Sequence, residues 1–512
     1  MRASVHEISL TQRYLWRSTR ESIPVQRAVV VELEQDGASG FGEASAFMTA
    51  HYNSGLDRMH ADLRRIAPLL AESDAEDPYA VWRRLARELP ASPFVLAAVD
   101  GAVHDLRARL LGVPLWRALD LPRPTGVRSS YSIGLDDVPV MVRKLRERSG
   151  WAAYKVKLAD PGDLTVLKEL REHTGAPFYV DGNCGWEPSR LLPALPRLAE
   201  LGVELIEQPF PRDDWAAAAE LKRASPVPVI ADESITSFAD LERCADAFHG
   251  INVKPMKAGG LTPALRLLTS ARDRGLVTML GCMPESAAGV SATAHLGGLV
   301  DHLDVDVVEL LAVDTGAGLT LDGTGRVGLP DRPGSGYLPD PDAHGWTVRP
   351  ADAGTARALW RTAGDPRPTG SAGPADLAEP GDGPGAWQLA ALRAGRPVGA
   401  LWMDRREPPR ALPAGSVPPR GPLWRLGGVV VRAGERGTGA GGALLRTGLT
   451  RAALTGAGGV WCHAPAGAVA LLRRYGFTAA PDAAAPDPAA PDPAADGGAA
   501  SGTRHLMYWS PA

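Results

Sequence analysis

The 512-residue sequence predicts a mixed α/β protein, in which a parallel (β/α) barrel is followed by a smaller α/β module. Three observations support this fold class. Short apolar, β-branched runs recur eight times and alternate with helix-like stretches, and polar residues stand at the ends of these runs. Beyond about residue 345 the composition changes to Ala, Gly, Pro and Arg. A chain of this length is also too long for a single core.

The barrel is predicted from the spacing of the strand-like runs, which begin near residue 128 and repeat with a period in the twenties of residues. Helix-like stretches such as "EPSRLLPALPRLAEL" and "LTPALRLLTSARDRG" separate them. An open doubly wound sheet is the alternative, but the eightfold count favours a closed parallel barrel. The runs are "RSSYSIGL", "AAYKVKL", "PFYVDGN", "VELIEQP", "PVIADES", "GINVKPM", "VTMLGCM" and "HLDVDVV".

Composition excludes several classes of function. The net charge is -4 and the pI about 6.3, so no overall basic field attracts nucleic acid. No apolar run reaches membrane-spanning length, and the N-terminal residues show no secretory signal. The four cysteines are far apart and form no metal or disulfide pattern. We therefore expect a soluble, cytoplasmic protein without a nucleic-acid or membrane partner.

Three carboxylates stand at the ends of successive predicted strands. Asp181, Glu207 and Asp232 are separated by 26 and 25 residues. The C-terminal ends of barrel strands converge on one mouth, so these groups should meet there. Each one alone could cap the helix that follows its strand, but three in register favour an oxygen site for a hard cation, with Mg²⁺ the best match.

Three lysines are also expected at the mouth of the barrel, beside these carboxylates. Lys155 and Lys157 share one face of the second strand, because the side-chain period of a strand is two. They could be solvated on an edge strand, but a barrel has no edges. In a barrel interior, desolvation and like charge would lower their pKa values toward those of neutral bases. Lys254 ends the sixth strand, which lies four places from the second strand in a ring of eight. Lys157 and Lys254 should therefore face each other. Two bases on opposite faces of one carbon atom are suited to inverting a stereocentre.

The motifs on these strands resemble the enolase superfamily, in its muconate-lactonizing subgroup, and most closely the dipeptide epimerases that act on L-Ala-D/L-Glu. The resemblance covers about residues 1–345. It implies a capping domain over 1–125, with a C-terminal return over 326–345, and a catalytic barrel over 126–325. The matching motifs are "GFGEAS", "KVK", "DGN", "IEQP", "ADES", "VKPMKAGG", "GCMPES" and "DVD".

Position by position, the resemblance implies Mg²⁺ bound by the three carboxylates, Lys157 and Lys254 as the acid/base pair, and Lys155 as the neutraliser of charge on the substrate carboxylate. Asp304 and Asp306 would bind the ammonium group of a dipeptide. An N-acylamino acid racemase has no such group and would leave both carboxylates unpaired. Further implied or candidate substrate contacts are Glu285 of "GCMPES" and, in the covering loops "WRSTRESIPVQ" and "SAFMTAHYNS", Arg17 and Arg20.

Two details depart from the commonest family pattern. The third strand carries "DGN" where "DAN" is frequent, a small change beside the metal. Pro255, directly after the second base, lacks an N–H group and could alter local backbone pairing. Neither departure removes a side chain that the chemistry requires.

The second module is expected over 346–512, starting with the strand "WTVRP" and including a low-complexity, disordered segment at 481–502. Its strand "PLWRLGGVVV" leads into a Gly-rich turn and a helix, a combination that binds phosphate through backbone N–H groups. The module resembles the GNAT-type N-acyltransferases, which implies acetyl-CoA or another acyl-CoA. The implied pyrophosphate contacts are Arg436, Gly437, Gly439 and Gly441.

The family's usual general-acid tyrosine is replaced in this module. Leu472 stands at that position, and Tyr475 occupies a position that is usually apolar core. The module could therefore transfer acyl groups or only bind CoA as a regulatory domain. The leading interpretation of the whole chain is an epimerase that acts on small dipeptides, fused to an acyltransferase. The alternative is an N-acylamino acid racemase with an acyltransferase. Self-association is left open.

Overall fold

The computed structural model describes residues 1–17, 22–49, 51–340, 342–362, 385–408, 421–479 and 504–511. Arg20 and the segment 481–502, which the sequence predicts to be disordered, lie outside them. The chain forms two compact units: the first comprises Met1, Ile8–Met59 and Ser73–Gly345, and the second Arg2–Glu7, His60–Glu72 and Trp346–Ala512. Among the described residues, no helix combines the length and apolarity needed to span a bilayer.

The N-terminal part of the chain builds a small sheet with helices. Strands β2 and β3 pair antiparallel in a hairpin whose turn contains Asp36 and Gly37 at positive φ, and α3 packs against β3. Helix α3 is buried along most of its length, and Asp100, His104 and Asp105 are buried together with its apolar residues. The elements are β1 (Arg2–Arg17), β2 (Ser22–Gln35), β3 (Ala38–Ser45), β4 (Phe47–Met48), β5 (Asn53–Ser54), α1 (Leu56–Ala71), α2 (Pro78–Glu88), α3 (Pro93–Leu110) and α4 (Leu115–Ala118).

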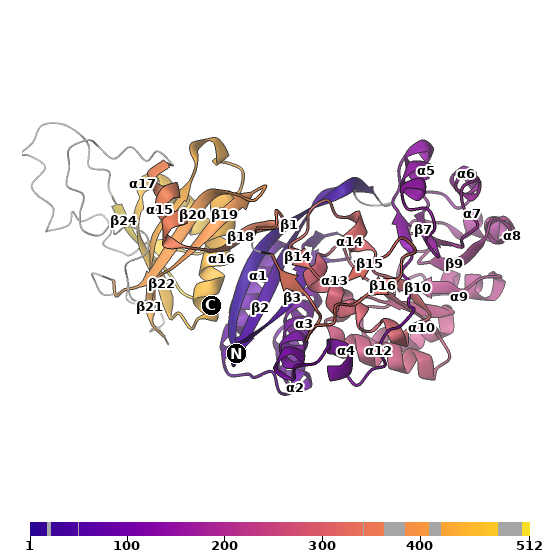
Figure 1. Ribbon diagram of the computed structural model, residues 1–512, viewed down its shortest axis with the longest axis horizontal. Helices are drawn as coiled ribbons and strands as arrows, with labels where there is room; N and C mark the ends of the chain where they lie inside the picture. Colours follow the sequence, from indigo (N-terminus) through magenta and orange to yellow (C-terminus); the bar gives the residue numbers. More distant parts are fainter. Residues whose placement is uncertain are drawn as a thin grey trace, which may run out of the picture. The chain divides into compact units, whose positions relative to one another are not determined.

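The eight strand-like runs form one parallel sheet in strict chain order, with helices lying outside the strands (Figure 1). The predicted parallel barrel is thereby confirmed. The first and last strands are joined by a single backbone bridge between Ser129 and Leu303. The strands are β6 (Tyr131–Ile133), β7 (Tyr154–Lys157), β8 (Phe178–Asp181), β9 (Val203–Glu207), β10 (Val229–Ala231), β11 (Gly250–Val253), β12 (Val277–Gly281) and β13 (His302–Asp304).

The helices between the barrel strands are short. The stretch "EPSRLLPALPRLAEL" does not form one helix, because Pro193 and Pro196 divide it into α7, a 3-10 turn and α8. Pro255 is accommodated at the first position of α11, where a helix needs no N–H donor. The helices are α5 (Val138–Glu147), α6 (Thr165–Arg171), α7 (Pro188–Leu191), α8 (Leu195–Glu200), α9 (Trp215–Ala224), α10 (Leu241–Ala247), α11 (Pro255–Ala258), α12 (Leu261–Asp273), α13 (Ala287–Ala294) and α14 (Val307–Leu310).

The barrel interior is layered by the two-residue period of its strands. Leu205, Ile230 and Met279 form a buried apolar cluster inside it. Two residues beyond Leu205 and Ile230, toward the C-terminal ends, stand Glu207 and Asp232. The apolar layer therefore supports a layer of charged side chains at the mouth. Short antiparallel pairs follow the barrel: β14 (Gly316–Ala317) with β17 (Leu338–Pro339), and β15 (Thr320–Leu321) with β16 (Val327–Gly328).

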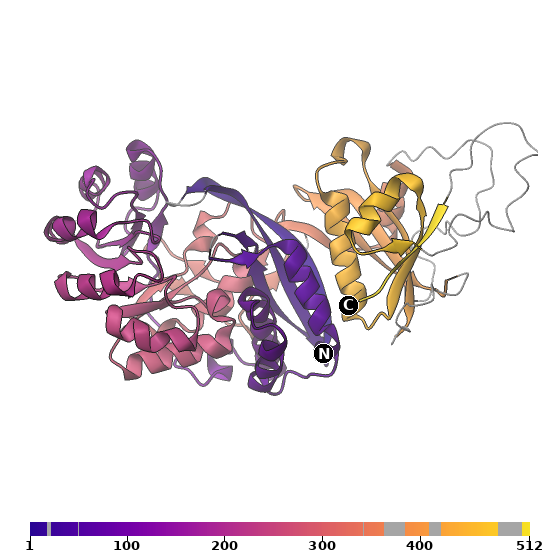
Figure 2. The same ribbon diagram turned by 180° about the vertical axis from the view of Figure 1, so that it is seen from behind.

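In the second unit, β18 to β21 pair antiparallel in chain order, and β21 then pairs parallel with β22. Helix α16 packs along β19, β20 and β21 and is the gold helix of this unit in Figure 2. The elements are β18 (Trp346–Ala351), α15 (Ala353–Thr362), β19 (Trp387–Arg393), β20 (Arg396–Arg405), β21 (Leu423–Val431), α16 (Ala440–Leu454), β22 (Gly459–Pro465), α17 (Ala466–Arg474), β23 (Thr478–Ala479) and β24 (Arg504–Trp509).

Candidate functional site

A cavity of about 710 Å³ lies at the C-terminal mouth of the barrel. Charged groups from four barrel strands or the residues directly after them reach it, and the covering segment that contains Phe47, Met48 and Tyr52 forms part of its wall. The lining side chains are Gln12, Phe47, Met48, Thr49, His51, Tyr52, Ser132, Lys155, Lys157, Asn183, Asp232, Glu233, Lys254, Cys282, Met283, Pro284, Asp304, Asp306, Val307 and Leu310.

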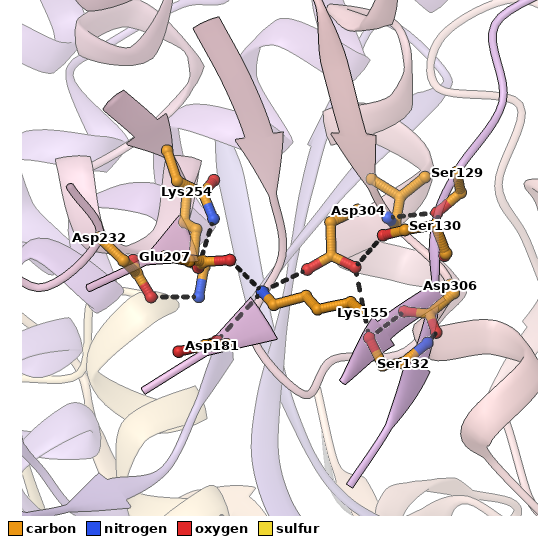
Figure 3. Close-up of polar contacts among 12 residues, drawn as sticks. Ser129, Ser130, Ser132, Lys155, Asp181, Glu207, Asp232, Lys254, Asp304 and Asp306 are labelled. Carbon is orange, nitrogen blue, oxygen red and sulfur yellow. Dashed lines mark hydrogen bonds and ion pairs between the residues drawn. The ribbon is translucent and has the colours of Figure 1, made fainter. Parts of the chain in front are cut away.

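Lys155 lies at the centre of the charged groups (Figure 3). Its Nζ is 2.7 Å from Glu207 Oε2, 2.8 Å from Asp304 Oδ2 and 3.4 Å from Asp181 Oδ2. Burial lowers the pKa of Lys155, but the three carboxylates outweigh it and hold the pKa well above its ordinary value. The sequence-based expectation of a lowered pKa was thus wrong for this residue, because it took no account of the carboxylates.

Lys157 and Lys254 line the same cavity from different strands. Lys157 Nζ donates to Asp181 Oδ2 at 2.6 Å and to Asn183 Oδ1 at 2.8 Å. Lys254 Nζ donates to Asp232 Oδ2 at 2.9 Å. Burial lowers the pKa of Lys254, but the nearby Asp232 more than compensates and raises it. The two amines therefore contact different carboxylates within one cavity.

Backbone and side-chain contacts fix the carboxylates. Asp181 Oδ1 accepts from the N–H of Asn183, which adopts a positive φ of 44°. Asn252 Nδ2 donates to Glu207 Oε1 at 2.9 Å. Gln208, also at positive φ, accepts from the N–H of Asp232 at 2.8 Å. Strained backbone at the ends of two strands is typical of a site whose surroundings impose the geometry.

Lys257 is a site residue that the sequence analysis missed. Its Nζ contacts Asp232 Oδ1, the Asp232 carbonyl and the Asn252 carbonyl, and its side chain is 1% exposed. The single turn of α11 brings it back toward the strand end. Its position in "VKPMKAGG", three residues after Lys254, was the available signal, since one helical turn returns to the same face.

The donor set fits a hard divalent cation. Asp181, Glu207 and Asp232 are fully or almost fully buried oxygen donors. Six buried carboxylates in and beneath the cavity against four lysines leave two excess negative charges if all are ionised. Burial and neighbouring carboxylates accordingly raise the pKa values of Glu207, Glu233 and Asp306. Glu233 Oε2 is buried without a hydrogen-bond partner among the described residues.

The described part of the chain contains no three acidic, histidine or cysteine side chains already grouped closely enough to hold a metal. Lys155 contacts both Asp181 and Glu207, so an ammonium group occupies the space between two of the predicted ligands. The chemistry of the donors matches Mg²⁺, and its binding requires the lysines to yield some of these contacts.

Asp304 and Asp306 reach the same cavity from the last strand and the residues after it. Asp304 Oδ1 accepts from Ser130 Oγ at 3.0 Å, and Asp306 Oδ2 accepts from the N–H of Ser132 at 2.5 Å. Burial raises the pKa of Asp306. The serines of "RSSYS" were not singled out from the sequence, and the alternation that places Ser130 and Ser132 on one face was the signal available.

The remaining predicted contacts lie elsewhere. Glu285 is not among the described residues that line the main cavity; it lines a separate cavity of about 20 Å³ together with Glu43. Arg17 is 48% exposed and lies 3.6 Å from Asp136. Arg20 lies outside the described residues.

The Gly-rich turn of the second unit connects β21 to α16. Gly437 and Gly439 have φ values of 82° and 93°, a region that glycine adopts without strain. Gly439 directly precedes α16, so the turn and the first N–H groups of a 15-residue helix lie together, and Arg436 and Gly437 are exposed. Gly441 lies in the first turn of the helix. The structure thus brings these four predicted residues together.

Two further residues of this unit, Leu472 and Tyr475, were singled out from the sequence. Leu472 is buried, and Tyr475 Oη accepts from Arg446 Nη1 at 3.4 Å beside α16. Strands β21 and β22 pair only over Leu423–Arg425 although both continue beyond this segment. The two parallel strands therefore diverge near the Gly-rich turn.

Three family models match the chain. Residues 8–119 match "Mandelate racemase / muconate lactonizing enzyme, N-terminal domain", and residues 138–343 match "Enolase C-terminal domain-like". Residues 356–477 match "Acetyltransferase (GNAT) family".

Relatives of known function resemble the first part of the chain. An L-Ala-D/L-amino acid epimerase from Flavobacterium johnsoniae is 39% identical over 321 residues, which are 63% of this chain and 95% of the relative. An L-Lys-D/L-Arg epimerase from Methylococcus capsulatus is 35% identical over 64% of this chain and 94% of the relative.

Solved structures of epimerases also resemble the first part of the chain. The L-Ala-D/L-Glu epimerase from Bacillus subtilis, in a substrate-liganded complex, has a TM-score of 0.63 and 25% identity, covering 66% of this chain and 98% of that one. A dipeptide epimerase from Methylococcus capsulatus, complexed with Mg and L-Arg-D-Lys, has a TM-score of 0.61 and 32% identity, covering 66% and 100%.

Proposed function

The chain belongs to the mandelate racemase and muconate lactonizing enzyme family of the enolase superfamily, and from this membership we propose that it is a Mg²⁺-dependent dipeptide epimerase. One observation carries the proposal: Lys157, Lys254 and the pair Asp304 and Asp306 all line a single cavity. This combination offers two amines for proton transfer and two carboxylates for an amino group.

The two lysines supply the proton transfer. In one direction Lys157 or Lys254, as a neutral amine, takes the α-proton from one face of the carbon atom. The other lysine, as an ammonium ion, delivers a proton to the opposite face, and the configuration inverts. Their strands, β7 and β11, are four places apart in the sheet order, which supports their action from different sides.

Asp181, Glu207 and Asp232 would hold the Mg²⁺. When bound, the ion supplies positive charge that stabilises the enediolate form of the substrate carboxylate. Lys155 would neutralise charge on the same carboxylate, and its contacts with Glu207 and Asp181, two of the proposed Mg²⁺ ligands, support this role. The buried setting strengthens each of these electrostatic interactions.

The substrate class follows from Asp304 and Asp306. Asp304 already pairs with Lys155, and the free amino group of a dipeptide would supply a second positive charge to the two buried carboxylates. An N-acylamino acid lacks that charge, so N-acylamino acid racemization is the competing activity that the test must exclude.

The test is proton exchange in D₂O with Mg²⁺, followed by NMR on a pool of L-Ala-L-Xaa dipeptides and a matched pool of N-acetyl-L-Xaa. We expect α-deuterium and the L,D epimers in the dipeptide pool. In Lys157→Ala and Lys254→Ala, exchange should be lost from the face served by the missing base, and epimerization should stop.

Lys168→Ala is the matched control, because Lys168 is an exposed lysine of α6 and is not among the described residues that line the cavity. It should retain full exchange. Exchange confined to the N-acetyl pool would replace the epimerase by a racemase, and exchange in neither pool would make the proposed substrate class wrong. Calorimetric titration with Mg²⁺ gives a second measurement, since Asp232→Asn should weaken binding independently of turnover.

For the second unit, we propose that acyl-CoA binds where β21 and β22 diverge, with its pyrophosphate at the N-terminus of α16. The exposed Gly-rich turn and the GNAT match support this. Equilibrium dialysis with acetyl-CoA should show binding that Arg436→Ala weakens.

Acyl transfer to a dipeptide amine is the proposed activity of this unit, although Leu472 cannot act as a general acid. Release of free CoA thiol with dipeptide acceptors tests it. Binding without thiol release in the presence of every acceptor would identify a CoA-responsive regulatory domain instead.

A further inference from the structure

The junction between the first and last barrel strands is held by serine side chains. Within the backbone bridge of Ser129 to Leu303, the N–H of Ser130 donates to the Leu303 carbonyl at 2.9 Å. Ser129 Oγ accepts from the N–H of Val305 at 2.8 Å. Hydroxyl groups therefore continue the junction where the backbone ladder ends.

Ser130 and Ser132 point into the barrel toward the two aspartates, as Figure 3 shows. Ser130 Oγ donates to Asp304 Oδ1 at 3.0 Å. Ser132 Oγ lies 3.3 Å from both Asp304 Oδ1 and Asp306 Oδ1, and its N–H donates to Asp306 Oδ2. Ser132 is thus the residue that touches both carboxylates.

Ser130 and Ser132 differ in whether a ligand in the cavity can reach them. Ser132 lines the cavity and is 6% exposed, whereas Ser130 is 2% exposed and is not among the described lining residues. Ser130 holds Asp304, whose other oxygen contacts Lys155. Ser132 lies where a group entering the cavity meets Asp304 and Asp306.

We propose that Ser132 is a specificity-determining positioning residue, which aligns Asp304 and Asp306 as a receptor for a primary ammonium group. The proposal rests on the proposed epimerase function and adds to it the residue that selects free amines.

The physical reason is the number of protons available. The hydroxyl proton of Ser132 can reach only one of the two Oδ1 atoms at a time, and Ser130 Oγ also donates to that of Asp304, whereas an ammonium group has three protons and a full positive charge. A primary ammonium can therefore bridge both carboxylates while Ser132 holds them in register. A ligand without it leaves these buried carboxylates with only neutral hydroxyl donors on their Oδ1 atoms and no added positive charge, which is costly.

The test compares two substrates that differ only in the amino group, L-Ala-L-Xaa and N-propionyl-L-Xaa, where Xaa is the residue that the wild-type enzyme epimerizes fastest. In Ser132→Ala we expect the KM for the dipeptide to rise about tenfold, the loss typical of a hydrogen bond to a charged group, with kcat changed far less. The slow reaction of the propionyl compound should be unchanged. Ser132→Thr, which keeps the hydroxyl, should restore the dipeptide KM.

Ser129→Ala is the matched control, because Ser129 belongs to the same junction but contacts neither aspartate in the described structure. It should keep the wild-type ratio of KM values for the two substrates. An equal loss on both substrates in Ser132→Ala, or no loss on either, would overturn the inference while wild-type epimerization stands. If the wild-type enzyme exchanges the α-proton of neither substrate, the proposed function is wrong, and so is this inference.

Discussion

Glu43 offers a stability test that is independent of turnover. This carboxyl group of β3 is almost completely buried and accepts hydrogen bonds from the N–H of Ser286 at 3.0 Å and from its hydroxyl. Burial raises the pKa of Glu43 to about 8, and the hydrogen bonds of Ser286 only partly offset it. We predict that Glu43→Gln, which keeps the shape and an acceptor, removes a pH dependence of the barrel's stability.

The direction of this pH dependence follows from the number of protons that the folded and unfolded states bind. The folded protein keeps a proton on Glu43 that the unfolded chain releases above its ordinary pKa of 4.5. The contribution of Glu43 to stability is therefore fully present below pH 4.5 and is lost as the pH rises to about 8. At about 1.4 kcal/mol per pH unit, the free energy of unfolding of the wild type should fall by about 3 kcal/mol relative to that of Glu43→Gln between about pH 6 and pH 9.

Hydrogen exchange of β12 and α13 in the full chain measures this difference, because α13 begins directly after Ser286. Glu169→Gln, at an exposed position of α6, is the control and should follow the wild type at every pH. A free-energy difference between Glu43→Gln and wild type that stays constant from about pH 6 to pH 9 would show that Glu43 is ionised and would refute the reasoning.

Three further predictions concern buried charges and the cation. Lys257→Met should lower the unfolding free energy of the Mg²⁺-free barrel by about 3 kcal/mol in urea titration, because Asp232 loses a buried partner. Arg425→Met should destabilise the second unit by a similar ~3 kcal/mol in calorimetry, because Asp404 is left buried without its 2.6 Å ion pair. Mg²⁺ at about 100 times its Kd should raise barrel stability by about 2.7 kcal/mol, and EDTA should reverse this shift in thermal unfolding.

The sequence was sufficient for the barrel because its signals are local and periodic. The eight runs gave the strand order, and the two-residue period put Lys155 and Lys157 on one inner face together with the strand-end carboxylates. Helix continuity was harder to foresee in the proline-containing segment 188–200. There the apolar spacing suits a single helix, but Pro193 and Pro196 remove donors and divide it.

Contacts between residues distant in sequence could not be predicted in the same way. Ser132 meets Asp306 across 174 positions of the chain, and Ser286 meets Glu43 across 243. No spacing rule connects such positions; only closure of the barrel and the packing of β3 against it do. The pKa of Lys155 was misjudged for the same reason, since its direction depends on carboxylates contributed by three other strands.

The lysines have two roles that the site must reconcile. They pair with the very carboxylates that would bind Mg²⁺ and so offset part of the negative charge at the barrel mouth. A base needs a neutral amine, whereas these contacts favour the ammonium form of Lys254. A divalent charge at the carboxylates would offset that preference and favour the neutral amine that proton transfer needs. Cation binding and deprotonation of the lysines would then favour each other, so Mg²⁺ affinity should increase as the lysines lose their protons.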